Sequence, residues 1–169
     1  ITSRLVGSEM CIRDRGYLTD TRTAIAGAIA TKYLSNQNAN SVGIIGAGIQ
    51  AKLQLQAIML VRKIKKIIVW TRDETKANQF IEGFKDLDLD LHVASSCKEL
   101  ASLSEIIVTT TPSKKPLLEF GWIIKGTHIT AMGSDAEQKN ELDPQMLKHC
   151  DQYVPCLLYT SPSPRDDLW

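Results

Sequence analysis

Apolar positions in this chain recur with two periods that alternate along the sequence. Spacings of three and four predict helices, which we place over residues 21–34, 50–61, 74–84, 96–100 and 144–148. Short runs rich in β-branched residues predict strands over residues 41–45, 64–70, 87–93, 105–110 and 127–132, with the start of a sixth over 152–154. Asp20 stands where the first helix would begin and is expected to cap it. Strands that alternate with helices predict an α/β fold with a doubly wound parallel sheet, in three layers α/β/α.

Composition narrows the possible functions. The 169 residues carry a formal net charge of +1, and 23% of them are charged. This balance offers no basic stripe of the kind that nucleic-acid binding requires. The longest apolar runs are far shorter than the ~20 residues of a membrane span, and no leader pattern stands at the start. We therefore expect a cytoplasmic protein of about one domain that binds neither nucleic acid nor membrane.

The two ends of the chain need a separate interpretation. One choice of codons for residues 5–15 has a reverse complement that encodes residues 156–165. The string also resembles a transposon adapter used to prepare sequencing libraries. We therefore interpret residues 1–15 and 156–169 as adapter-derived, non-native sequence and exclude them from the fold. The remaining segment keeps two unclustered cysteines, which offer neither a metal-site spacing nor a disulfide framework.

A glycine-rich turn joins the first predicted strand to the helix after it, with the sequence Gly46-Ala47-Gly48-Ile49-Gln50-Ala51. Gly46 permits a tight turn, Gly48 lets the backbone approach a pyrophosphate, and Ala51 is small enough for close packing of helix on strand. The start of the helix adds N–H groups and a positive dipole end. In this context the turn predicts a Rossmann-type dinucleotide site. The alternative is a tight strand–helix turn without a ligand.

The end of the second predicted strand bears on the choice between NAD and NADP. NAD sites commonly place an acidic residue there, whereas this chain has Thr71 and Arg72. Arg72 would pair with a 2′-phosphate and Thr71 would hydrogen-bond to it, so NADP(H) is favoured over NAD. The alternative for Arg72 is a solvated residue at a helix start. Thr109 and Thr111 end the fourth strand, where their hydroxyls would line the nicotinamide-ribose pocket.

Three strings together resemble the ornithine cyclodeaminase/μ-crystallin family. They are GYLTDTRTAIAGAIATKYL over residues 16–34, the glycine loop with its Gln50-Ala51 ending, and GTHITAMGSDAEQKNELD over residues 126–143. TTTPSKKPLL over residues 109–118 also fits. GYLTD and MGSDAEQKNEL are most similar to the branch associated with ectoine utilisation.

The resemblance implies a two-domain homodimer with a small amino-acid or cyclic-imine substrate. Residues 16–40 would be a linking helix from a missing substrate and dimerisation domain, and residues 41–155 the NAD(P)-binding domain. The implied contacts are Arg22 at a cofactor phosphate or the substrate carboxylate, Gly46, Gly48, Ile49 and Gln50 at the pyrophosphate, Thr71 and Arg72 at the adenosine ribose, Ile129, Ala131 and Met132 beside the nicotinamide, and Lys139 reaching the cofactor.

Asp135 is the catalytic acid/base that the resemblance implies. In a cyclodeaminase a hydride leaves the substrate α-carbon, an amine attacks the resulting imine, ammonia departs and the hydride returns. A carboxylate beside the nicotinamide would shuttle the protons of the amine steps. The alternatives are a ketimine-reductase-like or alanine-dehydrogenase-like enzyme that consumes NAD(P)H, and a non-catalytic NADPH-binding protein similar to μ-crystallin. Without the missing domain, we expect the chain itself not to turn over substrate.

Overall fold

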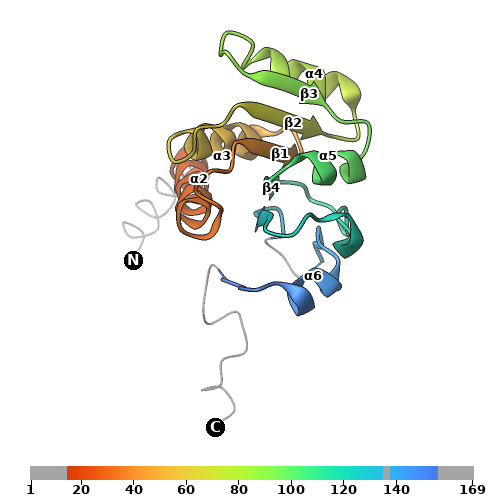
Figure 1. The fold of residues 1–169 in the computed structure, drawn as a ribbon. Coiled ribbons are helices and arrows are strands. Elements are labelled where there is room, and N and C mark those ends of the chain that lie inside the picture. The colour runs from red at the N-terminus through yellow and green to blue at the C-terminus, as the bar shows by residue number, and fades with distance from the viewer. Residues whose placement is uncertain (1–14, 135–137, 156–169) are drawn as a thin grey trace, which may run out of the picture.

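A five-stranded parallel sheet forms the centre of the protein (Figure 1). The computed structural model describes residues 15–134 and 138–155. The strands are β1 (Ser41–Ile45), β2 (Lys66–Trp70), β3 (Asp90–Val93), β4 (Ile106–Thr109) and β5 (His128–Ala131), in the order β3-β2-β1-β4-β5. Every neighbouring pair is parallel. The order reverses between β1 and β4, and in such sheets ligands bind outside the carboxyl ends of the strands at that point.

Helices cover both faces of the sheet, which confirms the predicted doubly wound architecture. They are α2 (Arg15–Leu34), α3 (Ile49–Met59), α4 (Glu74–Glu82), α5 (Cys97–Leu103) and α6 (Pro144–His149), with a 3₁₀ turn η1 (Phe120–Trp122) before β5. One core cluster joins α3 and α4 to the sheet through residues such as Leu55 and Phe80. A second joins α5 and α6 to the other face through Leu100 and Met146. None of the helices in the described residues is long and apolar enough to span a membrane.

Two expectations about the chain's local structure are wrong. Asp20 lies inside α2, which begins at Arg15, so it caps no helix; its carboxylate binds the side chain of Gln50 instead. Residues 152–154 form no strand, and Tyr153 and Val154 are exposed. A strand requires hydrogen bonds to a neighbour, and no segment among residues 15–134 and 138–155 pairs with 152–154.

Helix α2 lies against α3 through its small residues (Figure 1). Ala24 and Ala28 are buried, whereas Ile25 and Ile29 on the same helix are about half exposed. At Gly27 an added Cβ would lie 2.1 Å from Oε1 of the buried Gln54, whose Nε2 donates to the carbonyl of Thr23. A larger residue at Gly27 would require the Gln54 side chain to move, so the small residues rather than the large apolar ones attach α2.

Arg62 holds the C-terminal end of α2. Its buried guanidinium donates from Nη2 to the carbonyl oxygens of Thr31 (3.0 Å), Lys32 (2.8 Å) and Ser35 (3.1 Å). Nε donates to Ser35 Oγ and to the Asn36 carbonyl. The last carbonyls of a helix lack partners within the helix and carry its negative dipole end, so a cation there is stabilising.

Candidate functional site: a cleft at the carboxyl ends of β1, β4 and β5

The glycine loop between β1 and α3 has the geometry of a backbone cradle. Gly46 has φ +107°, and an added Cβ would lie 2.8 Å from Thr110 Oγ1 and 3.1 Å from the Thr110 carbonyl oxygen. Gly48 begins α3 as its N-cap, with no side-chain cap, and a Cβ there would meet nothing within 4 Å. The structure thus requires glycine at Gly46, whereas Gly48 leaves backbone open to a ligand.

A cavity of about 220 Å³ lies beside this loop. Its lining comes from the start of α3, from the loop after β4 and from the segment after β5: Gln50, Thr110, Thr111, Pro112, Met132, Gly133 and Lys139. The fold therefore brings together four of the residues singled out from the sequence, which are Gln50, Thr111, Met132 and Lys139. Thr110, Pro112 and Gly133 join them because they neighbour these residues in the same loops.

The side chain of Gln50 is held by helix α2. Its Nε2 donates to Asp20 Oδ1 at 2.7 Å and to the Asp20 carbonyl at 3.4 Å. Because this NH₂ group is already engaged, the group that Gln50 could offer a pyrophosphate is its backbone N–H at the start of α3. The contact between Asp20 and Gln50 also ties the position of α2 to the site.

Glu141 is a site residue that the sequence reasoning missed. It is fully buried, and its carboxylate accepts hydrogen bonds from the hydroxyls of Thr109 and Thr111 and from the backbone N–H groups of Thr111 and Gly133. A glutamate in a polar stretch has the sequence signature of a solvated residue. Its nearest sequence signal is its place in the GSDAEQKNELD string, which carried the family resemblance but implied no role for it.

The residues after β2 form a tight capped turn. Thr71 Oγ1 donates to the Asp73 carbonyl at 3.1 Å and accepts from the Asp73 N–H at 3.0 Å. The Asp73 carboxylate accepts from the Thr75 N–H and caps α4. Asp73 is therefore occupied as a helix cap, and Arg72 between these residues is exposed.

The other residues predicted for the site lie outside the cavity lining. Arg22 is exposed on α2, Ile49 is exposed at the start of α3, and Thr109 is buried with its hydroxyl on Glu141. Ile129 packs against the core cluster of α5, and Ala131 is exposed at the end of β5. Asp135 lies outside the described residues.

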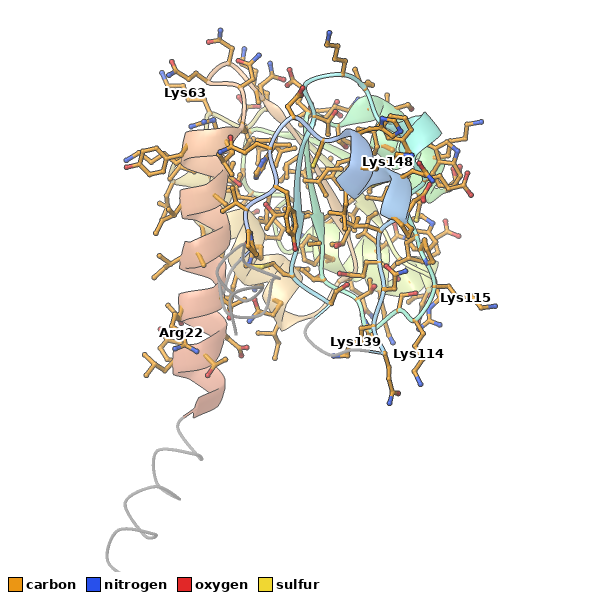
Figure 2. The ribbon with its side chains drawn as sticks, turned by 90° about the horizontal axis from the view of Figure 1, so that it is seen from below. Arg22, Lys63, Lys114, Lys115, Lys139 and Lys148 are labelled. Carbon is orange, nitrogen blue, oxygen red and sulfur yellow. The ribbon has the colours of Figure 1, made fainter. Side chains whose placement is uncertain are left out.

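Four of the labelled basic side chains lie toward one end of the molecule. Figure 2 shows Arg22, Lys114, Lys115 and Lys139 toward the same end, and Lys63 toward the opposite one. Of the four, Lys139 contributes to the cavity lining. A positive charge at a cleft attracts anionic ligands.

His128 is a partly buried structural histidine rather than a site residue. Its Nε2 shares a hydrogen bond with Thr130 Oγ1 at 3.0 Å, and burial, followed by the nearby positive charge of Arg62, lowers its pKa to about 4. It lines no part of the cavity. Among the described residues, no group of three or more histidine, cysteine or acidic side chains could hold a metal ion.

Comparison with known proteins places these features in a family. The family model described as "Ornithine cyclodeaminase/mu-crystallin family" matches residues 2–161. An uncharacterised cyclodeaminase of Sinorhizobium fredii is 48% identical over 142 residues, which cover 83% of this chain and 43% of that protein.

Two solved structures share both sequence and fold with the chain. An archaeal alanine dehydrogenase dimer with bound NAD has a TM-score of 0.76 and 38% identity, covering 79% of this chain and 41% of that one. The Δ(1)-pyrroline-2-carboxylate reductase of Thermococcus litoralis, in complex with NADH and L-proline, has a TM-score of 0.73 and 36% identity, covering 76% and 40%. The chain thus spans about two fifths of the length of these relatives. It belongs to the ornithine cyclodeaminase/μ-crystallin family.

Proposed function

We propose that the cleft binds a nicotinamide dinucleotide in an enzyme that acts on a small amino or imino acid. The observation that carries this proposal is the glycine loop, which leaves backbone open at Gly48 where the strand order reverses. The two solved relatives, which contain NADH and NAD, support it.

The residues divide the proposed dinucleotide into three parts. Gly48 and the backbone N–H groups of Ile49 and Gln50 would hold the pyrophosphate, because no side chain caps this end of α3. Thr71 and Arg72 would face the adenosine ribose at the end of β2. The cavity across β1 would receive the nicotinamide half. A dinucleotide bound there supplies reversible hydride transfer.

The reaction that we propose is cyclodeamination of a diamino acid. The balance is internal: the substrate α-amine leaves as ammonia, a distal amine closes the ring, and no net reduction occurs. Asp135 would hold and return the proton at the substrate amine, and Lys139 at the cavity would offer a positive charge to an anionic group of cofactor or substrate. Catalysis in the two-domain arrangement that the family resemblance implies would also need a substrate domain. We propose that domain as the site of homodimer formation.

A reductase is the second candidate. It is favoured by the identities of 36% and 38% to a pyrroline-carboxylate reductase and an alanine dehydrogenase. The turnover assay uses the full product of the gene, diamino acids, and a catalytic amount of cofactor. Ammonia release at constant NAD(P)H supports the cyclodeaminase, and NADPH oxidation in proportion to a cyclic imine substrate supports the reductase instead. Absence of turnover in both assays favours a μ-crystallin-like binding protein.

We further propose that the site prefers NADP(H). Arg72 is exposed at the end of β2, and the carboxylate of Asp73, the next residue in the sequence, is engaged as the cap of α4. An Arg–phosphate pair is a strong charge-assisted contact. Arg72→Asp should therefore weaken the affinity for NADPH at least tenfold and change the affinity for NADH about twofold or less. Fluorescence titration on the 169-residue chain measures both. Equal losses for both cofactors would remove the argument for NADP(H).

A further inference from the structure

A single buried carboxylate joins the loops that line the cavity. Glu141 is fully buried, and its two oxygens divide the donors evenly. Oε1 accepts from the Thr111 N–H and the Thr111 hydroxyl, both at 2.6 Å. Oε2 accepts from the Thr109 hydroxyl at 2.8 Å and the Gly133 N–H at 2.9 Å. The donors come from the end of β4 and from the segment after β5.

The Glu141 carboxylate lies so close to the backbone of Gly133 that this position has no room for a side chain. A Cβ at Gly133 would lie 2.6 Å from both carboxylate oxygens and 2.2 Å from the Thr111 carbonyl oxygen. The backbone of Glu141 is fixed as well, because its carbonyl accepts from the N–H groups of Leu117 (2.8 Å) and Leu118 (3.3 Å). Glu141 is therefore held from both its main chain and its side chain.

The chemistry of these contacts requires a carboxylate. A carboxylate presents only acceptors, and two of the four donors are backbone N–H groups that cannot rotate away. A glutamine would turn its NH₂ group toward the N–H of either Thr111 or Gly133, leaving a buried donor without a partner. The site is built for a side chain with two acceptor oxygens, and glutamine fits it only with local rearrangement.

The segments that Glu141 joins are those that shape the cavity. Thr111 and Gly133 both line it, and Thr110, Pro112 and Met132 are their immediate neighbours. On the opposite side of β1, the turn after β2 has its own capping contacts through Asp73 and makes none with Glu141. Loss of Glu141 should thus disturb one half of the cleft and leave the other half unchanged.

We infer that Glu141 is a positioning residue for the nicotinamide half of the cofactor. It sets the spacing between the β4 loop and the segment after β5, and so the shape of the cavity that receives the ring. This inference rests on the proposed function. Its distinguishing consequence is selectivity between ligands: Glu141 governs affinity for an intact dinucleotide but not for ADP-ribose, which lacks the nicotinamide ring.

The test compares NADH and ADP-ribose on the 169-residue chain by calorimetric titration, with folding verified by circular dichroism. Glu141→Gln should weaken the affinity for NADH about tenfold or more, as expected when a buried N–H group loses its acceptor. The affinity for ADP-ribose should change about twofold or less. The matched control is Glu105→Gln at the amino ends of the strands. The Glu105 carboxylate also accepts backbone N–H groups, those of Asn40 and Ser41, but it faces away from the cleft. Glu105→Gln should leave the affinities for NADH and ADP-ribose unchanged.

A gentler variant covers the case in which Glu141→Gln fails to fold. Thr109→Val removes one hydroxyl donor to Glu141, keeps the side-chain shape, and alters no exposed surface, because Thr109 is fully buried. It should reproduce the selective loss of NADH affinity at about two- to threefold. Equal losses for NADH and ADP-ribose, or no loss for either, would overturn the positioning role while leaving the proposed function intact. Wild-type protein that binds neither ligand would overturn both.

Discussion

Alanine at the two glycines of the β1–α3 loop should separate folding from cofactor binding. At Gly46 the substitution meets two obstacles. The φ of +107° costs a residue with a side chain about 1–2 kcal/mol. The new Cβ would also stand 2.8 Å from Thr110 Oγ1 and 3.1 Å from the Thr110 carbonyl oxygen, and relieving such overpacking costs about 1–3 kcal/mol. Gly46→Ala should therefore lower the free energy of unfolding by about 2–5 kcal/mol.

Gly48→Ala is the matched variant in the same loop. Gly48 has φ −87° and ψ −173°, a backbone that alanine adopts without strain, and its Cβ would touch nothing. We expect the free energy of unfolding to change by less than about 1 kcal/mol, because a weaker N-cap offsets a less flexible unfolded chain. The added methyl group stands where the pyrophosphate would approach, so NADH affinity should fall at least tenfold.

Urea unfolding followed by circular dichroism gives the stability of both variants, and NADH fluorescence gives the affinity. The reasoning is refuted if Gly46→Ala is as stable as wild type, or if Gly48→Ala loses as much stability as Gly46→Ala. A stable Gly48→Ala protein with unchanged NADH affinity would show that no pyrophosphate lies at this backbone.

The remaining predictions concern stability. Arg62→Met removes the donor to the Lys32 and Ser35 carbonyls and one of the donors to the Thr31 carbonyl, and it should lower the free energy of unfolding by about 3 kcal/mol. Lys63→Met at the exposed neighbouring position should change it by less than about 0.5 kcal/mol. Equal effects in urea unfolding would contradict the capping role. His128 has a folded-state pKa of about 4, below its ordinary 6.5, so the unfolded chain takes up this proton first as the pH falls. The free energy of unfolding should decline as the pH falls from about 6.5 to 4, by up to about 3 kcal/mol. His128→Phe should make it less dependent on pH in this range. An unchanged pH dependence in the variant would contradict the lowered pKa of His128. The carboxylate of Glu99 accepts hydrogen bonds from Ser95 and His92, which lower its pKa from 4.5 to about 2. Its contribution to the free energy of unfolding is therefore complete above about pH 4.5 and is lost as the pH falls toward 2. Glu99→Gln should remove this pH dependence.

Local chemistry alone determined the architecture of this protein. The runs at 41–45 and 106–109 are strongly apolar, and such periodicity depends only on neighbouring residues. Gly46 and Gly48 predict a dinucleotide-binding turn for the same reason, because the conformation of a turn is decided within a few residues. The order of strands and helices along the chain and the parallel sheet type therefore follow from patterns of short range.

Tertiary structure decided which side chains meet. Glu141 binds Thr109 across 32 positions of sequence, and Arg62 reaches Thr31 across 31. No local pattern specifies such partners, because a buried charge and a solvated one look alike until the chain is folded. The same holds for α2, where packing against α3 selected the small residues and left Ile25 exposed, although both kinds recur with the helical period. Periodicity reports that a helix has faces, and only the neighbouring elements decide which face is buried.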